Sequence, residues 1–214
     1  QGGQFSPHFQ AYNRNKRSIA LDLSSAEGKA VARRLLSTAD IVIENFRPGV
    51  MDKLGLGYEA LHGEFPRLIY CAITAYGESG PYVQKPGMDG VLQAMGGVMG
   101  HTGEPGGTPT RVGVPLADFT AAFLSLSAIS LALYDRERTG KGQKVSVALL
   151  DGQLALFANH MPGFAVTGKP DKPGKYLKII LIKKREPDKY GNVAYMIKED
   201  VSQAERAAGI EGGF

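Results

Sequence analysis

The chain has 214 residues, 43% of them hydrophobic, which is enough to form a core and excludes an intrinsically disordered protein. Residues 1–168 carry 15 Lys and Arg against 14 Asp and Glu, whereas residues 169–214 carry 10 against 7. The first part is therefore nearly neutral and lacks the basic face that nucleic-acid binding requires, so we expect no nucleic-acid partner.

The first predicted elements form a strand, a helix and a second strand. Ile19–Leu23 is predicted to be a strand, and Ser24 with Glu27 three residues later is typical of a capping box at the start of a helix, which we expect to run to about Thr38. Ile41–Ile43 is the second predicted strand. This order with short connections indicates a parallel sheet that is covered by helices.

The next segment combines a short helix, a strand and a long connection. We predict a helix over Val50–Leu54 and a third strand over Leu68–Thr74, with Cys71 inside the strand as a buried thiol. Residues 77–113 are rich in Gly and Pro and are predicted to be irregular, apart from a helix expected over Val91–Met95.

A long helix and a fourth strand follow. The helix is predicted from Asp118 to about Arg138, and we expect it to be buried because its apolar stretch is shorter than the roughly 20 residues of a membrane span. Val145–Leu150 is the fourth predicted strand, and Gln153–Ala165 the next helix, so Asp151 lies at their junction. Ligands of open parallel sheets collect beyond the carboxyl ends of the strands, where Asp151 is expected.

The predicted fold is α/β, with a parallel sheet, helices on both faces and an irregular C-terminal tail. We divide the chain into residues 1–168, which hold the sheet, and a basic tail over residues 169–214. The tail could contain one or two strands and a short helix over Val201–Ala208.

Few residues offer chemistry by their spacing alone. The four histidines lie far apart and there is one cysteine, so we predict no metal site, and the Gly96–Gly100 run is interpreted as a turn. Asp151 remains open at this point, because a carboxylate after an apolar strand suits both a catalytic group and the N-cap of the following helix.

Several separated motifs do carry a recognisable pattern: residues 13–23 (NRNKRSIALDL), 44–49 (ENFRPG), 54–58 (LGLGY), 76–81 (YGESGP), 86–89 (PGMD) and 140–151 (GKGQKVSVALLD). In this order they resemble the class III coenzyme A transferases, the formyl-CoA transferase and carnitine CoA-transferase group. The resemblance covers about residues 11–168 and implies the Rossmann-like large domain of that family.

The resemblance also implies a mechanism and a site. Asp151 would be the nucleophile that attacks an acyl-CoA thioester and passes through an anhydride and an aspartyl-CoA thioester, while Asp89 would orient or tune it. Coenzyme A is then a substrate, with a carboxylic acid as second substrate, and no cofactor is bound permanently. The positions implied to contact coenzyme A are Leu21, Asp22, Leu23, Ser24, Asn45, Phe46, Arg47, Lys53, Met88 and Asp89.

Alternatives and partners complete the prediction. The related α-methylacyl-CoA racemases have a His where this chain has Met88, and a thioether cannot transfer a proton, so a transferase is preferred over a racemase. We expect a cytoplasmic homodimer without a membrane partner, from an enzyme of which this chain is an incomplete part. The remaining alternative is a fragment without activity whose basic tail binds an acidic partner.

Overall fold

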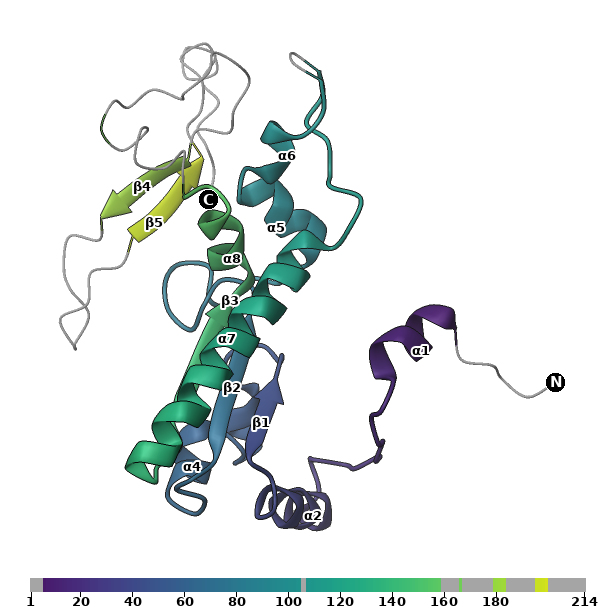
Figure 1. Ribbon diagram of the computed structural model, residues 1–214, viewed down its shortest axis with the longest axis vertical. Helices are drawn as coiled ribbons and strands as arrows, with labels where there is room; N and C mark the ends of the chain where they lie inside the picture. Colours follow the sequence, from purple (N-terminus) through teal and green to yellow (C-terminus); the bar gives the residue numbers. More distant parts are fainter. Residues whose placement is uncertain (1–5, 105–106, 159–165, 167–178, 184–194, 200–214) are drawn as a thin grey trace.

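The centre of the fold is a parallel sheet of three strands, β1 (Ile41–Glu44), β2 (Ile69–Thr74) and β3 (Lys144–Ala148), in the order β1-β2-β3 (Figure 1). The computed structural model describes residues 6–104, 107–158, 166, 179–183 and 195–199. Ile41 pairs with Ile69, and Tyr70 with Lys144. Helices cover both faces, so the predicted α/β class is confirmed.

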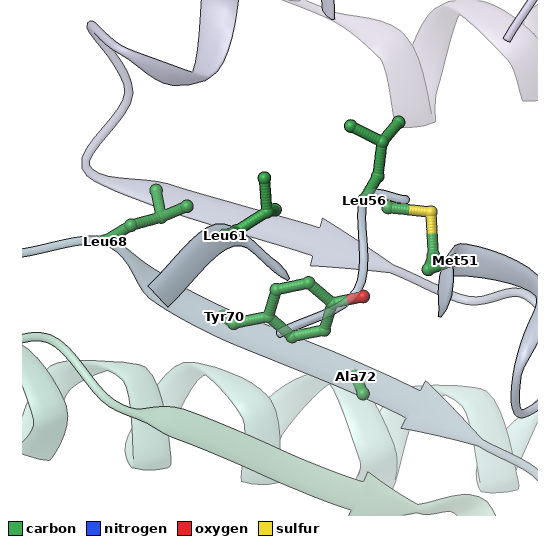
Figure 2. Packing of buried hydrophobic residues seen from close by; sticks show 6 residues of the cluster. All are labelled: Met51, Leu56, Leu61, Leu68, Tyr70 and Ala72. Carbon is green, nitrogen blue, oxygen red and sulfur yellow. The ribbon is translucent and has the colours of Figure 1, made fainter. Parts of the chain in front are cut away.

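One face of the sheet is covered by short helices. α2 (Ala26–Leu36), α3 (Val50–Lys53) and α4 (Tyr58–His62) pack there, and α1 (Pro7–Asn13) precedes them without buried residues. Figure 2 shows the buried cluster that joins α3 and α4 to β2, formed by Met51, Leu56, Leu61, Leu68, Tyr70 and Ala72. Alternation along β2 turns Tyr70 and Ala72 to this face, and Cys71, which is fully buried as predicted, to the other.

The opposite face is covered by the long helix α7 (Leu116–Thr139), which packs on β2 and β3. α5 (Asp89–Met95) and α8 (Leu149–Ala155) pack against α7, and α6 (Val98–His101) follows α5. Figure 1 shows α8 continuing from the end of β3, close to α5 and to the start of α7. A second buried cluster holds these elements together: Leu92, Ala117, Ala121, Val147, Leu149 and Leu150.

The expectation that α7 is buried is wrong for half of its surface. Its buried face consists mostly of small residues such as Ala117 and Ala121, whereas Phe123 is 68% and Leu131 is 70% exposed. By length and mean hydropathy alone, 1.8 over an 18-residue window, α7 would be long and apolar enough to cross a membrane. Small side chains on one face let the helix approach the sheet closely, while the large apolar ones point away.

The segment 19–23, predicted to be the first strand, belongs to no strand in the structure. Ile19 is 60% exposed, and Leu21 and Leu23 line an apolar groove of about 370 Å³ between this segment, α2 and β1. The predicted strand therefore has the right apolar alternation but no partner strand for its backbone. The start of α2 also differs by one residue, because the Ser25 side chain, not that of Ser24, accepts the hydrogen bond from Gly28 N.

The junction after β3 comes earlier than predicted. β3 ends at Ala148 and α8 begins at Leu149, so Asp151 lies in the first turn of the helix and not between strand and helix. Elsewhere β1, β2, α3 and α5 agree with the prediction within about two residues. Gly96 and Gly97 form a turn between α5 and α6, and Gly97 has a left-handed φ of 83°. The turn predicted over Gly96–Gly100 is wrong for its second half, because residues 98–100 belong to α6.

The C-terminal part contains two described strands, β4 (Ile179–Lys183) and β5 (Tyr195–Glu199), which pair antiparallel with Ile179 opposite Glu199. One or two strands were predicted in this part of the chain. The predicted helix over 201–208 lies outside the described residues.

Candidate functional site

The carboxyl ends of the three parallel strands bring distant parts of the chain to one edge of the sheet. β1 leads into Asn45–Arg47, β2 into Ala75, and β3 into α8 with Asp151. Neighbouring strands lie about 4.8 Å apart, so the ends of β1 and β3 are separated by about 10 Å. The edge therefore carries a carboxylate at one side and the segment before α3 at the other.

Asp151 is the third residue of α8, whose N-cap is Ala148. The Asp151 side chain is exposed, and within the described part of the chain it has no hydrogen bond or salt bridge. Capping of α8 therefore does not account for this carboxylate. Burial by the surrounding protein nevertheless raises the pKa of Asp151 above its ordinary value of 3.8, and no charged neighbour contributes to the shift.

This raised pKa predicts a stability effect. Because the folded protein favours the protonated form of Asp151, its contribution to stability is present below the ordinary pKa and is lost as the pH rises through the raised pKa. We expect Asp151→Asn to increase Tm at neutral pH and to have little effect in acid, below the ordinary pKa. Thermal unfolding of both proteins, followed by circular dichroism over this pH range, tests the prediction. A lower Tm of Asp151→Asn than of the unchanged protein at neutral pH contradicts it.

Four of the residues proposed to contact coenzyme A lie around the end of β1. Asn45 donates a side-chain hydrogen bond of 2.6 Å to the Ile73 carbonyl, which fixes the segment to β2. Phe46 is 50% exposed, and Arg47 and, on α3, Lys53 are exposed as well. Neither cation makes a salt bridge within the described residues, so both are available for an anionic ligand.

The segment 21–24 has a mainly structural arrangement. Leu21 and Leu23 line the apolar groove beside β1. The Asp22 carboxylate accepts hydrogen bonds from the Ser24 hydroxyl at 2.6 Å and from the Ser24 amide at 2.9 Å, and these bonds lower the pKa of Asp22. Asp22 and Ser24 thus form the turn that leads into α2.

Met88 and Asp89 begin α5 and differ strongly in environment. Met88 is 70% exposed, whereas the Asp89 side chain is buried. The Asp89 carboxylate accepts hydrogen bonds from Gln93 Nε2 at 2.8 Å, from Ala117 N at 2.8 Å and from the Arg111 guanidinium at 3.1 Å. Asp89 therefore joins α5 to the first turn of α7, and it does not contribute to the pKa shift of Asp151.

Arg111 and Gln93 belong to this cluster and were not found from the sequence. The pKa of Asp118 is raised mainly by burial and to a smaller extent by the negative charge of Asp89, whereas the positive charge of Arg111 lowers it. The spacing of Asp89 and Gln93 on one helix is a pattern that pairs side chains, and it could have indicated their contact. Arg111 gave no such signal, because 22 residues separate it from Asp89. Among the described residues, His, Cys, Asp and Glu side chains form no cluster of three or more that could hold a metal ion.

Comparison with known proteins gives one consistent family. The sequence profile described as CoA-transferase family III matches residues 2–178. The chain is 47% identical over 163 residues to succinate–glutarate CoA-transferase of Agrobacterium fabrum, covering 76% of this chain and 41% of that protein. It is 43% identical over 168 residues to acetyl-CoA:oxalate CoA-transferase of Acetobacter aceti, covering 78% and 43%.

A solved structure agrees with this result. A CaiB/BaiF family protein from Brucella suis matches with a TM-score of 0.70 and 41% sequence identity, over 85% of this chain and 48% of that chain. The chain thus spans less than half the length of these relatives.

Proposed function

Because the chain belongs to CoA-transferase family III, we propose that the protein transfers coenzyme A from an acyl-CoA to a free carboxylic acid, with Asp151 as nucleophile. The observation that carries the proposal is the exposed carboxylate of Asp151, which has no partner in the described part of the chain and lies at the carboxyl edge of the sheet. Relatives that act on different acids share this stretch of sequence, which supports the general reaction more than any single substrate.

The proposed reaction divides one exchange into four steps. The Asp151 carboxylate attacks the thioester carbonyl, the coenzyme A thiolate leaves, and a mixed anhydride forms. The thiolate attacks the aspartyl carbonyl, releases the donor acid and leaves an aspartyl-CoA thioester. The acceptor carboxylate displaces the thiolate to form a second anhydride, and the thiolate then attacks the acceptor acyl carbon, which frees Asp151.

The partial desolvation of the Asp151 carboxylate suits this role. Partial removal from water makes the carboxylate more basic and therefore a better nucleophile, as its raised pKa indicates. A carboxylate that formed a salt bridge, or that accepted a helix-capping hydrogen bond, would be a weaker nucleophile.

The first test is an exchange assay. Succinyl-CoA and glutarate are suitable probes, because a relative 47% identical to this chain is named for that pair of acids. We expect glutaryl-CoA to appear by liquid chromatography, and no exchange in either direction over a panel of acids contradicts the proposal. A racemase would instead exchange the α-proton of a 2-methylacyl-CoA without any acceptor acid, and Met88 offers no group for that step.

Arg47 and Lys53 are proposed to bind the phosphates of coenzyme A. A charge-assisted hydrogen bond to a phosphate contributes about 1.5–3 kcal/mol, so Arg47→Ala and Lys53→Ala should each increase Kd for coenzyme A about 10-fold or more. Isothermal titration calorimetry measures the Kd of each variant for coenzyme A. Arg34→Ala and Lys141→Ala are matched controls, because both residues are exposed near the opposite edge of the sheet. Equal effects of all four changes would indicate nonspecific attraction.

We also propose that the protein forms a homodimer through the exposed face of α7. Contiguous exposed apolar side chains mark protein interfaces, and this face carries Phe123, Leu124, Leu126, Leu131 and Tyr134. Leu126→Glu combined with Leu131→Glu should convert dimers to monomers in sedimentation velocity. A monomer before any substitution contradicts the proposal, and Glu137→Gln, on the same helix, is the control.

A further inference from the structure

We propose that Gln153 is a positioning residue, and that its contact with Thr120 on α7 sets where α8 presents the Asp151 carboxylate. The inference rests on the proposed role of Asp151 and adds residues that give the nucleophile its place. Gln153 follows Asp151 by two residues on α8, and Thr120 lies in the second turn of α7.

Gln153 is a polar residue in a fully buried position, where an apolar side chain would be expected. Its side chain is completely buried, with 0% exposure. Gln153 Nε2 donates a hydrogen bond of 3.3 Å to Thr120 Oγ1, and Thr120 Oγ1 donates in turn to the Leu116 carbonyl at 2.9 Å. Among the described residues Gln153 Oε1 has no partner. A Leu or Met would fill the same space without an unsatisfied oxygen, so the amide points to a requirement for the bond to α7.

The residue between Asp151 and Gln153, Gly152, lies against the same threonine without space for a side chain. A Cβ atom on Gly152 would lie 2.7 Å from Thr120 Oγ1 and 3.0 Å from Thr120 Cβ, so a larger residue requires a shift of Thr120 or of α8 against α7. On the other side of α8, a Cβ on Gly96 would lie 2.7 Å from Gln153 Cβ. Gln153 is therefore held between α7 and the end of α5.

The residue before Asp151 is held as well. Leu150 N donates a hydrogen bond of 3.1 Å to the Ala75 carbonyl, just after β2. Asp151 thus lies between a residue fixed to the sheet and two residues fixed to α7, while its own side chain has no partner in the described chain. The neighbours of Asp151 set its direction, since its carboxylate makes no hydrogen bond or salt bridge to the described residues.

The test uses substitutions on both sides of the contact between α8 and α7. Gln153→Leu keeps the volume and removes the bond to Thr120, and Gly152→Ala pushes α8 from α7. We expect each to lower kcat for CoA exchange about 10-fold, because misplacement of a reacting group by about 1 Å can lower a rate by up to about 100-fold, with KM for acyl-CoA changed less than about twofold. Thr120→Ala removes the same hydrogen bond from the side of α7, so it should lower kcat by a similar factor, with little further loss when it is combined with Gln153→Leu.

Two measurements separate positioning from a purely structural role. Thermal unfolding should show that Gln153→Leu has an unchanged or higher Tm, and a carbon-13 NMR titration of the Asp151 carboxyl should show a changed midpoint in Gly152→Ala. Gln143→Leu and Gly63→Ala are the controls. Gln143, just before β3, donates a side-chain hydrogen bond to Asp135 at the other end of α7, and a Cβ atom on Gly63 would meet no other atom within 4 Å. Both controls should leave kcat unchanged.

The outcomes also separate this inference from the function it rests on. Exchange that persists in Asp151→Asn overturns the proposed function and with it the inference. If Asp151→Asn is inactive while Gln153→Leu and Gly152→Ala keep normal kcat and a normal titration, only the positioning role is wrong. A kcat that stays normal in Thr120→Ala while it falls in Gln153→Leu also contradicts it, because the hydrogen bond between these two residues is then not the cause.

Discussion

Replacing Asp151 by Asn should reduce CoA exchange by about 10⁴-fold or more, because the amide cannot form the anhydride and removal of a covalent nucleophile costs most of the rate. The fold should be retained, since the Asp151 side chain is exposed and makes no contact in the described chain that an Asn would break. The exchange assay with succinyl-CoA and glutarate measures the loss, and circular dichroism verifies the fold.

A matched control is available on another short helix. Glu59 is an exposed acid in the first turn of α4, as Asp151 is in the first turn of α8. Glu59→Gln removes the same charge from an equivalent helical position and should leave exchange unchanged. Similar losses in both variants would mean that negative charge, and not a nucleophile at position 151, supports the reaction.

Replacing Asp89 by Ala should destabilise the protein by about 3 kcal/mol or more. The change removes the acceptor for Gln93, Ala117 and Arg111 from a buried position, and hydrogen bonds to a charged group contribute about 1.5–3 kcal/mol each. The first turn of α7 also loses the side chain that binds its free amide. Urea unfolding measures the difference.

The neighbouring charges provide the comparison for Asp89. Arg111 is 56% exposed on its side chain, so Arg111→Ala leaves a smaller defect and should cost no more than about 1 kcal/mol. If Asp89→Ala kept full stability and instead lost affinity for coenzyme A, Asp89 would be a ligand-binding residue, as the family resemblance implies, and not the structural link that its hydrogen bonds indicate.

The elements that the sequence predicts well are those with strong local signals. β2 is a run of apolar and β-branched residues from Ile69 to Thr74, and α7 ends at the left-handed Gly140, so composition and turn chemistry suffice. Segment 19–23 has an equally good strand pattern, yet it remains unpaired, because pairing depends on a neighbouring strand that local sequence does not specify.

The residues of the candidate site also differ in how far the sequence predicts them. Asp151 is predicted as the nucleophile by the family motifs, while its place after an apolar strand alone leaves its role open, and the parallel sheet brings it to the same edge as Arg47. Gln153 and Thr120 could not be found, because 33 residues separate them and their contact depends on the packing of α8 against α7. Asp89 was selected as a binding residue, whereas its partners, Arg111 and the first turn of α7, become visible only in the fold.

The most direct test of the account is chemical trapping of the proposed intermediate. After the protein reacts with succinyl-CoA, hydroxylamine should convert an aspartyl thioester to a hydroxamate, which tandem mass spectrometry of peptides locates. We predict a hydroxamate on Asp151, only when acyl-CoA is present. A hydroxamate on another carboxylate, or none after turnover, would contradict the claim that Asp151 carries coenzyme A covalently.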